Sequence, residues 1–190
     1  MNPVSLASIA QQRMRRFVGD QDGVSAVEFA LLLPLMLTLY LGGVEVSQAV
    51  SADRKTMLVA HSIGDIISQY SCVTSSDMTN IFSVGQEVVY PYDPTNLKAT
   101  ATSVTVDANG RATVAWSQAL NGGTVRSGDV TSLIPAALLT ASLSSSLIWA
   151  EATYSYRPTV GYVITGTLTL NEKIFLRPRL TNAVAYPTCT

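Results

Sequence analysis

VSAVEFALLLPLMLTLYLGGV, residues 24–44, is the segment that decides how this chain is organised. Glu28 is its only charged residue. A helix rises about 1.5 Å per residue, so this segment spans roughly 30 Å, the thickness of the hydrocarbon core of a bilayer. The alternative is a buried core helix, but an amphipathic helix would show polar residues every three or four positions. The segment therefore predicts a transmembrane helix, which we place at residues 24–46.

Charges on the two sides of this helix predict its orientation. Arg13, Arg15 and Arg16 precede it, whereas the charges just after it, in residues 45–55, are mixed in sign. Positively charged flanks stay in the cytoplasm. We therefore expect a single-pass protein of a bacterial inner membrane, in contact with lipid, with a cytoplasmic leader at residues 1–23 and an exported, periplasmic remainder.

The helix is expected to continue beyond the membrane, over residues 47–70. Apolar residues recur there at spacings of three and four, with polar residues between them. This is the pattern of an amphipathic helix, and its apolar side is expected to pack on the exported head.

Residues 71–190 change from helical to alternating patterns and predict the head. Two hairpins and one short helix are expected: strands Thr100–Val106 and Ala112–Trp116, strands Leu147–Tyr156 and Tyr162–Leu170, and a helix Leu133–Leu139. The predicted fold class is α+β, with a long N-terminal helix followed by a small antiparallel sheet of about four strands and short helices on one face.

The residues at the start of the apolar segment suggest processing of the chain. A carboxylate such as Glu28 costs several kcal/mol inside a bilayer unless it is paired. A cut after Gly23 would give Val24 a new α-amino group, which is positively charged near neutral pH. That group could pair with Glu28 of a neighbouring subunit. The alternatives are that Glu28 sits in a first helical turn and reaches the headgroups, and that Gly23 is an ordinary loop glycine.

These residues resemble a known processing site. Gly23, four further residues, Glu28 and Phe29 are similar to the prepilin peptidase site of type IV pilins and pseudopilins. Residues 23–49, with Pro34 in the apolar segment and Glu45 at its end, resemble the N-terminus of TadE/TadG-type minor pseudopilins of the tight-adherence (Flp, type IVb) pilus system. EATYSYRP, residues 151–158, resembles the E-x-x-Y-x-Y-x-P strand of that family, and RPR, residues 177–179, resembles the basic segment that follows it.

The resemblance implies a function and a set of partners. Prepilin peptidase would cut between Gly23 and Val24, and Glu28 would guide assembly with other pilin and pseudopilin subunits and inner-membrane assembly proteins. Major Flp pilins are much shorter and usually have Tyr where this chain has Phe29, which favours a minor pseudopilin that supports pilus assembly and surface attachment. Two alternatives stay open: an uncleaved periplasmic scaffold, or a signal peptidase cut after Ala49 that releases a soluble binding protein or enzyme.

Cys72 and Cys189 are the only cysteines. Outside the cytoplasm disulfides persist, so we expect a bond between them that ties the end of the long helix to the C-terminal tail. The alternative is two unpaired thiols.

Other chemistry finds little support in the sequence. His61 is the only histidine, and no residue pattern places it beside a nucleophile, so no enzyme activity is expected. No cofactor motif and no metal-ligand spacing is present, and a net charge of −1 gives no reason to expect a nucleic-acid partner. Five tyrosines either pack across strands or form an exposed recognition surface: Tyr90, Tyr92, Tyr154, Tyr156 and Tyr162.

Overall fold

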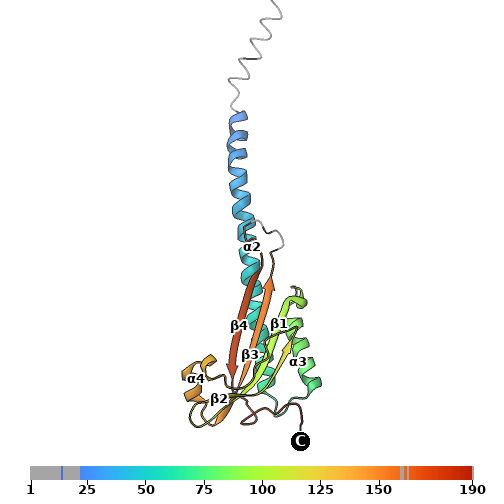
Figure 1. Ribbon diagram of the computed structural model, residues 1–190. Coiled ribbons are helices and arrows are strands. Elements are labelled where there is room, and N and C mark those ends of the chain that lie inside the picture. Colours follow the sequence, from blue (N-terminus) through green and yellow to red (C-terminus); the bar gives the residue numbers. More distant parts are fainter. Residues whose placement is uncertain (1–13, 15–21, 159–160, 162, 190) are drawn as a thin grey trace, which may run out of the picture. The chain divides into compact units, whose positions relative to one another are not determined.

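The computed structural model describes residue 14, residues 22–158, residue 161 and residues 163–189. Arg13, Arg15 and Arg16, which were expected to set the orientation in the membrane, lie outside these residues. The chain forms two compact units, residues 1–44 and residues 45–190. Helix α2, Asp22–Ser68, contributes to both units and is labelled in Figure 1.

In the first unit, α2 is apolar and its side chains lie exposed. Leu31 and Leu39 are 75% and 69% exposed, although both are large hydrophobic residues. Thr38, the polar side chain in the middle of this stretch, donates its hydroxyl hydrogen to the carbonyl oxygen of Pro34 at 2.8 Å, so its polarity is satisfied within the helix. By length and composition, α2 is long and apolar enough to cross a membrane.

In the second unit, α2 has a buried and an exposed face. The buried face carries Ala52, Val59, Ala60, Ile63 and Ile67, each at most 1% exposed. This face packs on the sheet, where a Cβ added to Gly64 would lie 3.1 Å from a methyl carbon of Leu176. The prediction of an amphipathic helix that reaches about residue 70 and packs on the head is confirmed.

The sheet has four antiparallel strands in the order β2-β1-β3-β4. Their bounds are β1 Leu97–Val106, β2 Ala112–Leu120, β3 Ser145–Tyr156 and β4 Leu168–Leu176. The first predicted hairpin is confirmed as β1 and β2. Its turn forms because the Asp107 carboxylate accepts hydrogen bonds from the N–H groups of Asn109 and Arg111, while Gly110 takes the positive φ of +79°.

The second predicted hairpin exists as β3 and β4, but its second strand begins later than Tyr162. Residues 163–167 are not part of a strand, and β4 starts at Leu168. Gly161 and Gly166 have positive φ angles, and the N–H groups of residues 163 and 164 donate to a side chain rather than to a strand. The alternation of residue types over 162–170 therefore predicted the start of this strand too early.

The predicted short helix Leu133–Leu139 is in fact two elements. A 3₁₀ helix, η2, covers Thr131–Leu133, and α4 covers Ala136–Ala141. Pro135 stands between them as the N-cap of α4 with an extended backbone, rather than inside the first turn.

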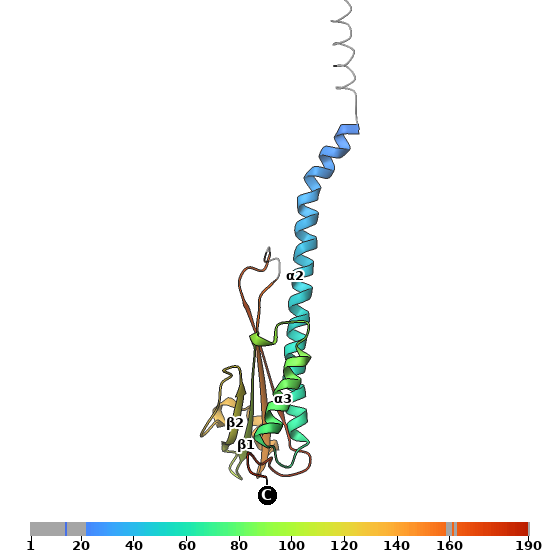
Figure 2. The ribbon, with the colours of Figure 1, turned by 90° about the vertical axis from the view of Figure 1, so that its right-hand side faces the viewer.

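Helix α3, Ser75–Val88, was not predicted. It begins with a capping box, in which the Thr74 hydroxyl accepts from the N–H of Asp77 at 3.2 Å and the Asp77 carboxylate accepts from the N–H of Thr74 at 3.0 Å. Helix α3 packs on α2 through Gly85, where an added Cβ would lie 3.1 Å from Ile63. Figure 2 shows α2 and α3 on one side of the sheet.

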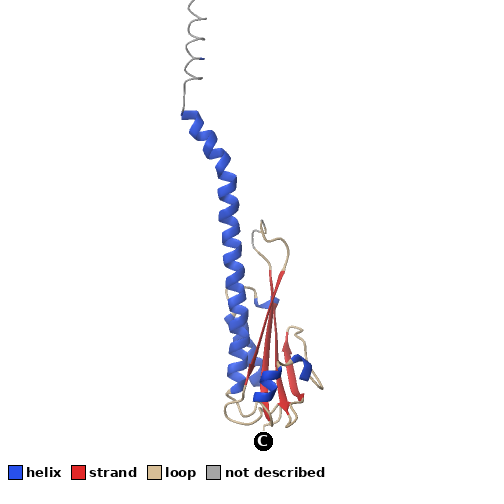
Figure 3. Cartoon of the chain, turned by 90° about the vertical axis from the view of Figure 1, so that its left-hand side faces the viewer, coloured by secondary structure: helices blue, strands red, loops and turns tan. Residues whose placement is uncertain are grey.

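The opposite face of the sheet is only partly covered. A smaller apolar cluster there includes Val104, Leu147 and Trp149 from the strands and Ile134 and Leu139 from the segment that contains η2 and α4. The remaining part of this face is polar and open, as described below. Figure 3 shows the strands to one side of α2, with short helical elements among the loops.

The two edges of the sheet differ. The start of the outer edge of β2 is covered by the following loop, because the N–H of Val114 donates to the carbonyl oxygen of Gly128 and the N–H of Val130 donates to that of Ala112, both at 2.9 Å. Strand β4 forms the other edge, and among the described residues no strand pairs with its outer side.

Candidate functional site

The residues of the predicted processing site lie at the start of α2. Gly23 and Val24 are in the first turn of the helix, and Val24 is 54% exposed. A Cβ added to Gly23 would have no heavy atom within 4 Å. Within the described part of the first unit, nothing therefore covers the bond between these two residues.

Glu28 follows Val24 by four positions, so both residues lie on the same side of α2. Glu28 is exposed, and residues 22–44 contain no lysine or arginine that could neutralise it. The helix thus brings the proposed new terminus and the carboxylate onto one face, which is the arrangement that pairing between neighbouring helices requires.

Glu45, at the end of the apolar stretch, makes contacts that were not predicted. It is the first residue of the second unit and is only 1% exposed. Its Oε2 accepts hydrogen bonds from the N–H groups of Val163 at 3.0 Å and Ile164 at 2.8 Å. Glu45 therefore ties the β3–β4 connection to α2.

Extending the helical spacing of the predicted amphipathic segment back to Glu45 could have indicated that this residue is buried. Buried positions on α2 recur at Glu45, Ala52, Thr56, Val59 and Ile63, in steps of seven, four, three and four. These steps keep to one helical face, so Glu45 shares the face that packs on the head. A carboxylate on such a face needs hydrogen-bond donors, and the glycine-containing connection supplies them.

One turn further along α2, Gln48 contacts a cluster of tyrosines. The Tyr92 hydroxyl donates to the Gln48 carbonyl oxygen at 3.0 Å, and the Tyr92 ring lies 6.1 Å and 6.0 Å from the rings of Tyr154 and Tyr156. Burial raises the pKa of both Tyr154 and Tyr156 above the usual 10.0. These three tyrosines therefore pack against one another.

The other two tyrosines differ from this cluster. Tyr90 is 74% exposed, whereas Tyr162 lies outside the described residues.

The first residue of the EATYSYRP stretch holds an ion pair on the open face of the sheet. Glu151 accepts from Arg126 through both carboxylate oxygens at 2.7 and 2.8 Å. The Arg126 guanidinium also lies 3.9 Å from the centre of the Trp149 ring. The pair is about one-fifth exposed on each side, so it is shielded more than an ordinary surface pair.

The RPR segment also makes defined contacts. Arg177 donates to the Ser142 hydroxyl at 3.2 Å, and Arg179 forms an ion pair with Asp65 of α2. In addition, the Arg179 N–H donates to the carbonyl oxygen of Ser68 at 2.8 Å, at the end of α2. The segment thus fastens the C-terminal region to α2.

The predicted disulfide is present. Cys72 and Cys189 are bonded across a sequence separation of 117 residues. Cys72 also forms a parallel bridge with Ala185: the N–H of Val73 donates to the carbonyl oxygen of Ala185 at 2.9 Å, and the N–H of Ala185 donates to that of Ser71 at 3.1 Å. The C-terminal tail is therefore held beside the segment that follows α2.

Comparison with known proteins matches residues 23–62 to the family model described as TadE-like protein. Residues 23–62 are therefore a TadE-like segment. The match supports involvement of the chain in the Tad pilus system and covers most of α2, including Gly23, Glu28 and Glu45. No curated protein and no solved structure matches the chain.

The TadE-like segment contains residues from both units. Its first part is the apolar stretch, which is compatible with single-pass membrane anchoring, and its second part forms the buried face that packs on the head. His61, near the end of the TadE-like segment, is exposed on α2. In the part of the chain that the structure describes, no three His, Cys, Asp or Glu side chains are grouped as metal ligands would be.

Proposed function

We propose that this protein is a TadE-like minor pseudopilin that supports assembly of a tight-adherence (Flp) pilus and attachment to surfaces. The observation that carries the proposal is the spacing of Gly23 and Glu28 at the start of an apolar helix, inside the TadE-like segment. The head would stand on the periplasmic side, and after assembly on the pilus or cell surface.

The proposed maturation follows from charge. Arg13, Arg15 and Arg16 would keep the leader in the cytoplasm. Prepilin peptidase would then hydrolyse the bond between Gly23 and Val24, which leaves an α-amino group on Val24. In a bilayer this ammonium and the Glu28 carboxylate of a neighbouring subunit would each lower the cost of burying the other. Other pilin or pseudopilin subunits and inner-membrane assembly proteins are therefore the expected partners.

Release as a soluble protein is the weaker alternative. A cut after Ala49 would remove Glu45 and Gln48 from the second unit. The N–H groups of Val163 and Ile164 would lose the acceptor they share, and the Tyr92 hydroxyl would lose its acceptor at 3.0 Å. The cut would thus remove three hydrogen bonds that connect α2 to the head, so the contacts of the head argue against it.

The mature N-terminus tests the proposal directly. We expect mass spectrometry of the protein from piliated cells to find Val24 as the first residue. An intact Met1 would instead support an uncleaved periplasmic scaffold, and Val50 would support a released protein. Either of these two results would contradict the proposal.

Substitution of Gly23 sharpens this test. Gly23→Leu should block maturation and leave a product that is larger by the mass of the leader. Gly43→Leu is the matched control, because a Cβ at Gly43 also has no heavy atom within 4 Å. Equal maturation of the two variants would count against processing at Gly23.

The role of Glu28 needs a separate readout. Glu28→Ala should still be processed but should fail to enter the pilus, because Val24 loses its partner. Glu87→Ala, which removes an exposed carboxylate from the head, should assemble normally. Normal incorporation of Glu28→Ala would remove pairing from the proposal and leave the processing step intact.

A further inference from the structure

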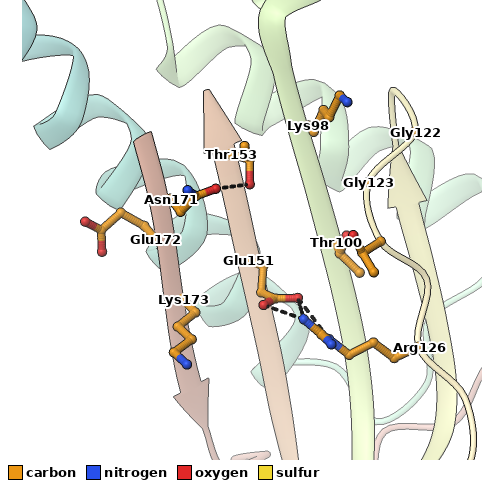
Figure 4. A pocket seen from close by; sticks show the side chains of 11 residues that line it. Lys98, Thr100, Gly122, Gly123, Arg126, Glu151, Thr153, Asn171, Glu172 and Lys173 are labelled. Carbon is orange, nitrogen blue, oxygen red and sulfur yellow. Dashed lines mark hydrogen bonds and ion pairs between the residues drawn. The ribbon is translucent and has the colours of Figure 1, made fainter. Parts of the chain in front are cut away.

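The open part of the sheet contains a groove that the proposed assembly role does not use. Its volume is about 560 Å³, within the range of small-ligand sites. Strands β1, β3 and β4 form its floor, and the loop after β2 forms one wall (Figure 4). It lies on the face opposite α2 and α3, because Thr100 and Glu151 alternate along their strands with Ala99, Ala101, Ala150 and Ala152 of the core.

The wall of the groove is held in a defined position. A Cβ at Gly123 would lie only 2.5 Å from the carbonyl oxygen of Ala99, so the loop backbone lies directly on β1. Asn121 donates to the carbonyl oxygen of Leu97 at 2.9 Å, and the N–H of Arg126 donates to the Ser117 hydroxyl at 3.1 Å. The groove is therefore formed before any ligand binds, which lowers the entropic cost of binding.

The chemistry of the groove selects a polar ligand. Every residue that lines it is polar or glycine: Lys98, Thr100, Gly122, Gly123, Thr124, Arg126, Glu151, Thr153, Asn171, Glu172 and Lys173. Trp149, the aromatic residue beside it, is 2% exposed and covered by the Arg126 guanidinium. Among the described residues, the groove thus has no aromatic surface on which a nucleobase could stack.

The balance of charge favours an anion. Arg126 is neutralised by Glu151, whereas the side chain of Glu172 extends away from the other lining side chains in Figure 4. The ammonium groups of Lys98 and Lys173 have no ion pair among the described residues. The lining residues carry three cations and two carboxylates, so the groove has an excess of one positive charge and two lysines that are not held in ion pairs.

The register of the strands gives the spacing of these charges. Two rows of paired residues cross strands β1, β3 and β4. The first row is Lys98, Thr153 and Asn171, and the second is Thr100, Glu151 and Lys173. Lys98 and Lys173 are thus two strands and two residues apart, which separates their Cα atoms by about 12 Å. An elongated ligand with more than one acidic group matches this separation.

Hydrogen-bond acceptors near the two lysines further restrict the chemical class of the ligand. The Glu151 carboxylate and the Asn171 amide, which accepts from the Thr153 hydroxyl at 2.8 Å, lie between the two cations. A carboxylate in this position repels a dense polyanion, but it can accept hydrogen bonds from ligand hydroxyls. A ligand with spaced carboxylates and many hydroxyls satisfies both requirements.

We propose that this groove binds an acidic carbohydrate, namely an oligosaccharide that contains uronic acids. Lys98 and Lys173 pair with its carboxylates, while Glu151, Thr153 and Asn171 bind its hydroxyls. The inference does not depend on cleavage or on pilus assembly, because it concerns the folded head alone.

Titration of the full-length protein in detergent with an oligogalacturonate tests the inference. At low ionic strength we expect binding that is about tenfold weaker in the K98Q/K173Q variant, since each lost ammonium removes a charge-assisted hydrogen bond. The matched control is R54Q/K55Q, which removes two cations from α2 and should bind as the parent protein does. Tryptophan fluorescence confirms that each variant is folded.

Three results would overturn the inference. The first is equal binding of oligogalacturonate by the parent protein and K98Q/K173Q. The second is equal affinity for a neutral malto-oligosaccharide of the same length, which would make the charges irrelevant. The third is tighter binding of polyphosphate than of oligogalacturonate, which would exclude the role of the ligand hydroxyls. Because purified protein is used, failure here leaves the assembly proposal untouched.

Discussion

The two parts of helix α2 differ in how far their large apolar side chains are buried. Before Glu45 its large apolar side chains are exposed, as with Leu31 at 75%, whereas after Glu45 they are sorted onto a buried face, as with Ile63 at 0%. Both parts are helical, so secondary structure alone does not separate them. The comparison shows that only the second part obtains its burial from this chain. The exposed apolar surface of the first part is compatible with a membrane around it.

The largest expected effect on stability comes from removing the disulfide of the second unit. Replacing both Cys72 and Cys189 with Ser should lower the free energy of unfolding by about 4–5 kcal/mol in the chain-entropy model, because the bond closes a loop of more than a hundred residues. Urea denaturation followed by tryptophan fluorescence measures this, since Trp116 and Trp149 are the only tryptophans and both lie in the second unit. An unchanged midpoint after reduction of the parent protein would contradict the prediction.

The next prediction tests the two parts of α2 with the same kind of truncation. Ile63→Ala should cost about 2–5 kcal/mol of unfolding free energy, because Ile63 is completely buried and a cavity would remain. Leu32→Ala, on the exposed first part, should leave unfolding of the head within about 0.5 kcal/mol of the parent protein. Similar losses in both variants would mean that the first part also supports the head.

Glu45 lies at the boundary between the two parts of α2. Its substitution should have an intermediate effect on the free energy of unfolding. Glu45→Gln keeps the size of the side chain but removes the charge that accepts from Val163 and Ile164. We expect a loss of about 1.5–3 kcal/mol, the usual contribution of hydrogen bonds to a charged group. Glu28→Gln is the control in the first unit and should not change the urea midpoint of the head.

The smallest expected effect is at the start of α3. Thr74→Ala removes the side-chain cap and should cost about 1 kcal/mol. This variant changes no residue of α2. It therefore shows how much a substitution outside α2 lowers the free energy of unfolding.

The same cap predicts a dependence on pH. Hydrogen bonds from the Thr74 hydroxyl and then from its N–H hold the pKa of Asp77 below the usual 3.8. A lowered pKa in the folded state stabilises the fold above pH 3.8, and this contribution is lost as the pH falls through the folded value. The stability difference between the parent protein and Thr74→Ala should therefore shrink in acid; a constant difference would contradict the assignment.

Local patterns predicted much of this fold. The apolar segment, the amphipathic face of α2, the Asp107–Gly110 turn and the pairing of two hairpins are each visible in neighbouring residues, because each depends on spacing along one element. The disulfide could be expected because the chain has only two cysteines and the sequence predicts an exported head.

Features that depend on distant residues could not be predicted in the same way. The late start of β4 follows from the contact of Glu45 with residues more than a hundred positions away. The groove depends on the register of three strands and on a loop that lies on Ala99. Helix α3, in contrast, could have been predicted, because Thr74 and Asp77 have the spacing of a capping box in the sequence.

The unequal edges of the sheet limit how copies of this protein can associate. Edge-to-edge growth of sheets into fibrils needs two unpaired strand edges on every molecule, one to receive a neighbour and one to offer to the next. The loop that bonds to Ala112 and Val114 blocks the start of the β2 edge. A new strand would therefore pair more easily with β4 than with β2, and this difference disfavours continuous edge-to-edge growth of the sheet.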